Sequence, residues 1–122
     1  MPTIRISLTL TIDNVNVRGF PVQLTQVVDE LQQFDYEEPA DNNDTTFSAL
    51  PVQEVDTVQF LYMKALQAVG LRVEGSELTN VAIRLSANGF IIIGNCTLTD
   101  SNITVNRNAA TVARLEGLAG GT

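Results

Sequence analysis

Hydrophobic and polar residues alternate at the start of the chain. Every second position from Ile4 to Ile12 holds Ile or Leu, and the positions between them hold Arg, Ser or Thr. A period of two predicts a strand with one buried face and one solvated face. Asp13 and Asn14 are turn-forming residues. We therefore expect an N-terminal hairpin whose second strand is short, because Pro21 limits how far it can run inside a sheet.

Residues 22–38 carry two patterns at once. Alternation through Leu24, Gln26 and Val28, and again through Phe34 and Tyr36, fits a strand. Four apolar residues also have the i, i+3, i+4, i+7 spacing of an amphipathic helix: Leu24, Val27, Val28 and Leu31. Because the rest of the chain has β-type patterns, a strand is slightly favoured here. A short helix near residues 24–34 stays open as the alternative.

Short apolar runs follow one another from Thr57 onward, at the spacing of about 8–12 residues that is typical of a sandwich or barrel. Residues 60–63 and 90–93 are apolar without a break, and each run predicts a strand buried on both faces. With the N-terminal strands, the total is eight to nine short strands. We therefore predict an all-β fold, a single antiparallel β-sandwich domain over residues 1–122 that is jelly-roll-like.

Composition and charge fit one globular domain with a protein partner. Hydrophobic residues make up 44% of the chain, and seven basic against fourteen acidic residues give a net charge of −7. An acidic surface repels phosphate groups, so we expect no nucleic acid and no membrane partner. No apolar run approaches the roughly 20 residues of a membrane span. The start of the chain lacks the features of a signal peptide, which predicts synthesis in the cytoplasm.

Candidate catalytic and metal-binding residues are few. The chain has no His, and Cys96 is its one Cys, so the usual nucleophile–base pairs and zinc sites are excluded. Cys96 is expected to fill the core as a small hydrophobic residue. The carboxylates of residues 29–38 lack the aromatic groove of a glycosidase. We therefore predict no enzyme activity, no catalytic residue, no cofactor and no metal, although a weak calcium site in the 37–46 loop stays open.

A family resemblance rests on three stretches, Gln59–Gly75, Val81–Gly94 and Ile103–Thr122. They contain the FLY-K strand, the ANG turn followed by FIIIG, and the LEGLAGGT terminus. In these features the chain resembles small minor structural proteins of tailed bacteriophages. The resemblance implies a sandwich module that decorates or cements a capsid shell, or that lines the neck or tail.

Three exposed segments are candidate partner contacts. The strand Thr3–Ile12 could pair with a neighbouring subunit by edge addition, or be an ordinary strand of the domain. The loop at residues 37–46 is expected to be solvated, and the glycine-rich end is expected to be a flexible or partner-docked tail. The candidate contact residues in these segments are Thr3, Arg5, Ser7, Thr9, Thr11, Glu37, Glu38, Asp41, Asp44, Leu118 and Thr122.

The expected function is therefore that of a structural virion protein of a tailed bacteriophage, bound to the capsid shell as a decoration or cement protein. Alternatives are a neck or tail component, and a sandwich module that binds a glycan or receptor. The expected partners are the major capsid protein or other virion proteins. We also expect a homo-oligomer, because symmetric shells present repeated sites. The expected location is the virion, assembled in the host cytoplasm.

Overall fold

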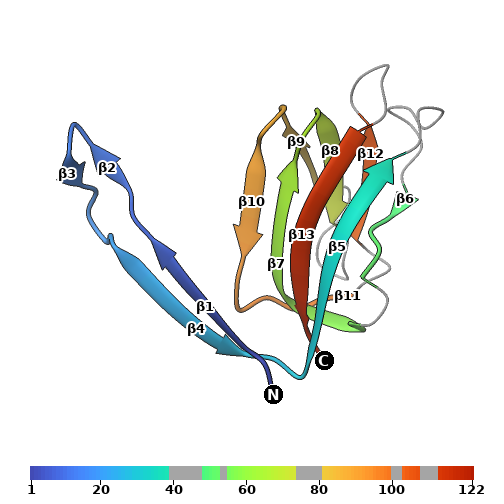
Figure 1. The fold of residues 1–122 in the computed structure, drawn as a ribbon, viewed down its shortest axis with the longest axis horizontal. Coiled ribbons are helices and arrows are strands. Elements are labelled where there is room, and N and C mark those ends of the chain that lie inside the picture. Colours follow the sequence, from blue (N-terminus) through green and yellow to red (C-terminus); the bar gives the residue numbers. More distant parts are fainter. Residues whose placement is uncertain (39–47, 53–54, 74–80, 100–102, 108–112) are drawn as a thin grey trace.

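The computed structural model describes residues 1–38, 48–52, 55–73, 81–99, 103–107 and 113–122. The described chain forms two parts, a two-layer β-sandwich and a two-stranded arm that leans away from it (Figure 1). All strand pairs are antiparallel. The prediction of an all-β antiparallel fold is confirmed.

The two layers of the sandwich are here named the front sheet and the back sheet. The front sheet has the order β10-β7-β13-β5, with the short β11 also paired to β7. Its strands are β5 (Glu30–Glu38), β7 (Thr57–Ala65), β10 (Phe90–Ile93), β11 (Leu98–Thr99) and β13 (Ala113–Gly121). The back sheet has the order β6-β12-β8-β9. Its strands are β6 (Ser48–Ala49), β8 (Val69–Val73), β9 (Val81–Leu85) and β12 (Ile103–Arg107).

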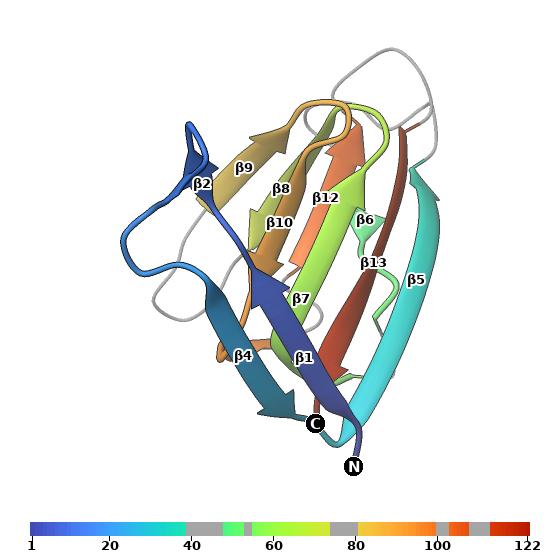
Figure 2. The same cartoon turned by 60° about the vertical axis from the view of Figure 1, so that its left-hand side comes forward.

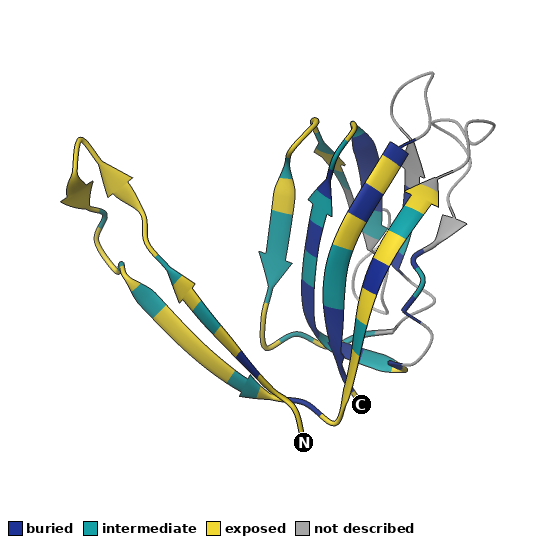
Figure 3. Ribbon diagram, viewed as in Figure 1, coloured by how far each residue is buried: buried dark blue, intermediate teal, exposed yellow. Residues whose placement is uncertain are grey.

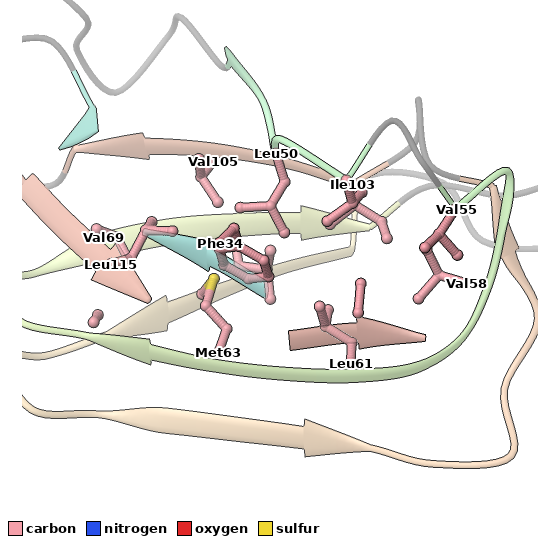
Figure 4. Close-up of a cluster of buried hydrophobic side chains, with 14 of the residues drawn as sticks. Phe34, Leu50, Val55, Val58, Leu61, Met63, Val69, Ile103, Val105 and Leu115 are labelled. Atoms are coloured by element: carbon pink, nitrogen blue, oxygen red, sulfur yellow. The ribbon is translucent and has the colours of Figure 1, made fainter. Parts of the chain in front are cut away.

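The main hydrophobic core lies between these two sheets (Figure 4). Leu61 and Met63 of β7 and Leu115 of β13 enter it from the front sheet, and Leu71 and Ile103 from the back sheet. All five side chains are fully buried. Burial of a large aliphatic side chain contributes roughly 1.5–3 kcal/mol, so this core supplies most of the stability of the sandwich.

The arm consists of β1 (Thr3–Leu8) paired with β4 (Val22–Val27), and it is extended by the short pair β2 (Thr11–Ile12) and β3 (Val15–Asn16). Asp13 and Asn14 form its two-residue turn, with φ angles of 51° and 65°. Positive φ at both positions is the geometry of a type I′ hairpin, and Asn and Asp tolerate it better than most residues. The predicted N-terminal hairpin is therefore present, but its main second strand is β4, beyond Pro21.

Residues 22–38 form two strands, so the alternative of a short helix near 24–34 is wrong. β4 ends at Val27 and β5 begins at Glu30, and the chain changes sheets between them. Val28 is buried at this corner, whereas Val27 is exposed. The helix-like spacing of apolar residues arises because two alternating strands are joined at a corner where the alternation shifts.

Two further expectations are tested by the positions of the strands. β7 lies between β10 and β13, which confirms the central position predicted from residues 60–63. The prediction that residues 90–93 are buried on both sides is wrong, because β10 is an edge strand and Phe90 is exposed.

Four of the thirteen strands in the described ranges are two residues long, which leaves nine longer ones. This number agrees with the predicted eight to nine.

For the glycine-rich end, the alternative of a flexible tail is wrong, because its glycines belong to a central strand. β13 runs to Gly121 and pairs with both β5 and β7. The amide of Thr122 donates to the carbonyl of Thr57, and the amide of Thr57 donates in return. A Cβ on Gly117 or Gly121 would collide with the backbone of β7. These glycines therefore allow a close approach of strands, which composition alone does not distinguish from flexibility.

Candidate interaction surface

The arm has one apolar face and one polar face. In the β1–β4 register, Ile6 stands opposite Leu24 and Leu8 opposite Val22, so their side chains project from the same face. Ile4 shares this face, opposite Gln26. We name this apolar set the arm stripe: Ile4, Ile6, Leu8, Val22 and Leu24. The other face carries Thr3, Arg5, Ser7, Gln23, Thr25 and Val27.

The base of the arm stripe packs on the outer face of the front sheet. Ile4 and Val28 form a second hydrophobic cluster with Phe60 of β7, and Ile6, Tyr62, Ile92 and Leu118 pack against it. Gly120 of β13 lies beneath this contact, where an added Cβ would come within 2.9 Å of Ile4 Cδ1. The absence of a side chain at Gly120 therefore lets the arm approach the sheet.

A β-bulge in β7 fixes the arm at the same place. Gly120 pairs with Phe60 but Gly121 pairs with Val58, so Gln59 stands opposite no residue of β13. The bulge turns Phe60 toward the arm while Val58 stays in the main core. It also frees the Gln59 carbonyl, which accepts hydrogen bonds from Gln26 Nε2 at 2.9 Å and from the Cys96 amide at 3.1 Å.

A hollow of about 460 Å³ lies beside this junction, lined by Thr25, Gln26, Val27, Gln59, Asn95 and Cys96. Gln26 Oε1 accepts a hydrogen bond from the Asn95 amide at 3.2 Å, which links the arm to the β10–β11 connection. Cys96 is half-buried, and its Sγ lies 3.6 Å from the Val58 carbonyl. Burial raises the pKa of this thiol. Cys96 lies outside both hydrophobic clusters, so the prediction that it fills the core is wrong.

The outer face of the front sheet is arranged in rows across its strands. Ile92, Tyr62, Leu118 and Gln33 share the row that meets the arm. Phe90, Lys64, Glu116 and Asp35 share the next row, and Arg114 and Glu37 the row after it. Figure 2 shows the arm crossing in front of this sheet, and Figure 1 shows it leaning away from the sandwich toward its tip. The second and third rows are polar except for Phe90.

Large apolar side chains remain uncovered on both surfaces beyond the contact at the base. Ile4 is only 9% exposed, whereas Leu24 is 38% exposed, and Ile12 and Val15 at the tip are 67% and 68% exposed. On the front sheet, Phe90 is 62% exposed. Figure 3 shows the same contrast between the mostly exposed arm and the buried strands of the sandwich. Exposed apolar patches mark interaction sites, so these residues are candidate contacts.

Asp35 and Arg114 form an ion pair on the outer face. Arg114 Nε donates to Asp35 Oδ1 at 3.0 Å, and Arg114 Nη2 donates to Asp35 Oδ2 at 2.7 Å. These hydrogen bonds lower the pKa of Asp35. Glu116 is the register partner of Asp35 on β13, so two carboxylates are neighbours here. A glycosidase general acid needs a raised pKa, so the lowered pKa of Asp35 does not fit that role.

The predicted contact residues occupy several separate places. Thr3, Arg5, Ser7, Thr9 and Thr11 are all exposed, and the first three lie on the polar face of the arm. Glu37 is exposed on β5, and Glu38 is the last residue of that strand. Leu118 is half-buried beneath the arm, and Thr122 is exposed at the same end of the sheet. Asp41 and Asp44, and with them the calcium alternative, lie outside the described residues.

The apolar part of this surface was missed by reasoning from the sequence. Alternation predicts a buried face for Leu24, and the unbroken apolar run 90–93 predicts burial of Phe90 on both sides, but both side chains are exposed. The signal for Phe90 was its place directly after the ANG turn, where a strand begins and its first side chain is less covered. No group of three or more metal-ligating acidic, Cys or His residues occurs in the described part of the chain.

The described residues form no helix long and apolar enough to cross a membrane. Comparisons with family models, with curated proteins and with solved structures find no match for this chain.

Proposed function

We propose that this protein is a structural virion protein of a tailed bacteriophage, bound to the capsid shell as a decoration or cement protein. The observation that carries the proposal is the arm, a two-stranded element that leaves the sandwich and presents uncovered apolar side chains. An element of this kind suits a protein whose task is to join other proteins. The resemblance of residues 57–122 to phage structural proteins points to the same role.

The order of the sandwich strands supports this role. The sandwich has eight strands besides β11, and they can be numbered along the chain from β5 as the first to β13 as the eighth. In this numbering, the front sheet β10-β7-β13-β5 has the order sixth, third, eighth, first. The back sheet β6-β12-β8-β9 has the order second, seventh, fourth, fifth. We infer from this order that the sandwich is a jelly roll, an architecture used by viral capsid and lectin domains. Fold by itself does not establish function, so the arm carries more weight.

The net charge of the chain is also consistent with a place on the outside of a capsid shell. The chain has a net charge of −7. Such a surface favours contact with proteins and disfavours contact with packaged DNA. The partners proposed are the major capsid protein or other virion proteins, and the location is the assembled virion.

Copy number in purified particles tests the proposal. Particles from a culture that carries the gene are purified by density gradient, and the protein is quantified by mass spectrometry against the major capsid protein. A decoration protein is expected in hundreds of copies per particle. A few copies would instead indicate a neck or tail component. Absence from particles, with the protein present in the cell lysate, would refute a virion role.

A second candidate, glycan or receptor binding, is favoured by a hollow of about 600 Å³ on the outer face of the front sheet. Its lining combines carboxylates, an amide and a tyrosine: Gln33, Phe34, Asp35, Tyr62, Glu116, Gly117 and Leu118. Carboxylates beside an aromatic ring can hold sugar hydroxyls and a sugar face. Binding on a glycan array that is lost in Glu116→Gln would support this candidate, and a blank array would exclude the glycans tested.

A further inference from the structure

We infer that the arm of one copy docks on the outer face of the front sheet of a second copy of this chain. The contact would join the part of the arm stripe outside the second cluster, the half-buried Leu8 and Val22 and the exposed Leu24, to the row of the sheet that contains Phe90. This mode of self-association goes beyond the proposed virion role, and it does not depend on which particle contains the protein.

The contact within one copy shows that these two surfaces fit each other. Ile4 and Ile6 of the arm stripe already pack on Phe60, Tyr62 and Ile92 of the front sheet. Both surfaces then continue beyond the contact. The arm stripe continues to Leu24, and the sheet continues from Ile92 to Phe90 on the same strand and the same face. Leu24 and Phe90 therefore extend the apolar contact on the two surfaces, and the other positions in the row of Phe90 are charged.

Charge is divided between the two parts in a way that favours binding between copies. Residues 1–27 hold two of the seven basic residues and one of the fourteen acidic ones, a net charge of +1. The remaining residues hold five basic and thirteen acidic residues, a net charge of −8. Arg18 is exposed near the tip of the arm. In the row of Phe90, Lys64 is the direct neighbour, and Glu116 and Asp35 follow on the next two strands. A basic arm is thus attracted to the acidic sandwich of another copy.

Symmetry makes a second copy a better occupant than an unrelated acidic protein. If the arm of each copy lies on the sheet of the other, every contact occurs twice in a two-fold dimer. The same arm-to-sheet contact passed from copy to copy would close a ring. In both cases Leu24 and Phe90 are covered, which a monomer would leave in water.

The first test measures self-association of the full chain. Sedimentation velocity over a range of about 1–100 μM is expected to show a concentration-dependent dimer or closed oligomer that weakens as salt is raised. Phe90→Ser and Leu24→Gln change exposed positions and are each expected to raise the dissociation constant about tenfold or more. Val27→Gln is the matched control, because Val27 is 52% exposed on the opposite face of the arm. A monomer at all concentrations, or an oligomer that Phe90→Ser and Leu24→Gln leave unchanged, would overturn the proposal.

The second test locates the contact. Leu24→Cys and Phe90→Cys are made separately in a Cys96→Ser background, mixed and oxidised, and a disulfide-linked pair containing one of each is expected. Mixing Val27→Cys with Phe90→Cys is the control and is expected to give no such pair. If the double variant Leu24→Cys/Phe90→Cys instead forms its disulfide within a monomer, the arm closes on its own sheet and the proposal is wrong. Both tests can fail while the protein is still found in virions, so the two proposals are judged separately.

Discussion

The two hydrophobic clusters of this protein differ in how they are closed. Among the residues that the structure describes, the cluster between the sheets has fifteen buried residues and receives side chains from both layers. In the same part of the chain, the cluster beneath the arm has three buried residues, and Leu24 beside it is exposed. The first cluster holds the sandwich together without the arm, whereas the arm depends on the sandwich. The sandwich is therefore a stable body, and the arm is an element of low stability. Segments that move or bind usually have such low local stability.

The largest effect is expected from a change in the main core. Leu61→Ala removes a fully buried side chain between the sheets, and the free energy of unfolding should fall by about 2–5 kcal/mol. Urea denaturation followed by circular dichroism measures this loss. The exposed Leu10→Ala is the control and should leave the transition almost unchanged. Equal losses for the two variants would contradict the division between body and arm.

Alanine substitutions at two glycines of β13 test the difference between the two clusters directly. Gly117→Ala places a Cβ against the Tyr62 carbonyl and the Phe34 ring inside the front sheet, so overpacking should cost about 1–3 kcal/mol. Gly120→Ala places a Cβ near Ile4 Cδ1, the end of an arm side chain that can move. Its loss of stability should be smaller. Thermal unfolding of both variants ranks them, and the reverse order would mean that the arm is held as rigidly as the sheet.

Ile4→Ala should loosen the arm while the sandwich stays folded. The substitution removes most of a side chain that is almost fully buried at the base of the arm, a loss of about 2 kcal/mol. Hydrogen exchange should show faster exchange of the amides that pair β1 with β4 and unchanged protection in β7 and β13. Thr3→Ala, at the exposed neighbouring position, provides the control. Uniformly faster exchange throughout the chain would show that arm and sandwich unfold as one unit.

Gln26→Ala should weaken the junction between the arm and the bulge. The variant loses the hydrogen bond to the Gln59 carbonyl and the one from the Asn95 amide, which together are worth about 1–2 kcal/mol. Because Cys96 lines the same hollow, its alkylation rate reports on this opening. The rate should be low in the parent protein, whose thiol has a raised pKa, and higher in the variant. Gln23→Ala, on the other face of β4, should leave the rate unchanged.

The smallest effect concerns the exposed ion pair. The pKa of Asp35 is lowered by Arg114, so the contribution of the pair is present above the unfolded pKa of Asp and is lost as the pH falls through the lower folded value. Arg114→Gln should therefore be slightly less stable than the parent at pH 7, and the difference should begin to shrink near pH 4, at about the unfolded pKa of Asp, and disappear below the lowered folded pKa. Both side chains are more than half exposed, so water screens the pair. A difference that persists at low pH would show that Arg114 acts through packing.

The strands of the sandwich could be predicted because their patterns are local. The alternation from Ile4 to Ile12 and the continuous run at residues 60–63 each correspond to an observed strand or pair of strands. Phe90 shows the limit of such patterns, because whether an apolar strand is central or at an edge depends on its neighbours in the sheet. Gly117 shows a second limit of such patterns, since a glycine that allows close packing and a glycine that allows flexibility look alike in a sequence.

The candidate surface could be predicted only in part, because it depends on where the arm points. Alternation identified one polar face of the N-terminal strand, and Thr3, Arg5 and Ser7 are exposed as expected. The arm stripe was expected to be buried along its whole length. Leu24 is exposed because the arm packs on the sheet only at its base, where the bulge at Gln59 and the corner at Val28 hold it, and leans away toward its tip (Figure 1). Neither feature has a recognisable signature in the sequence.

The position of β13 has a consequence for biosynthesis. β5 emerges from the ribosome early, but its partner begins at Ala113, which pairs with Glu38. At about 5–20 residues per second, the ribosome needs roughly 4–15 s to translate the intervening chain. During that interval β5 and β7 have no strand between them, and their edges are open to other nascent chains. Folding is therefore expected to be largely post-translational and sensitive to crowding on polysomes, so that chaperones able to shield strand edges should raise the yield of native protein.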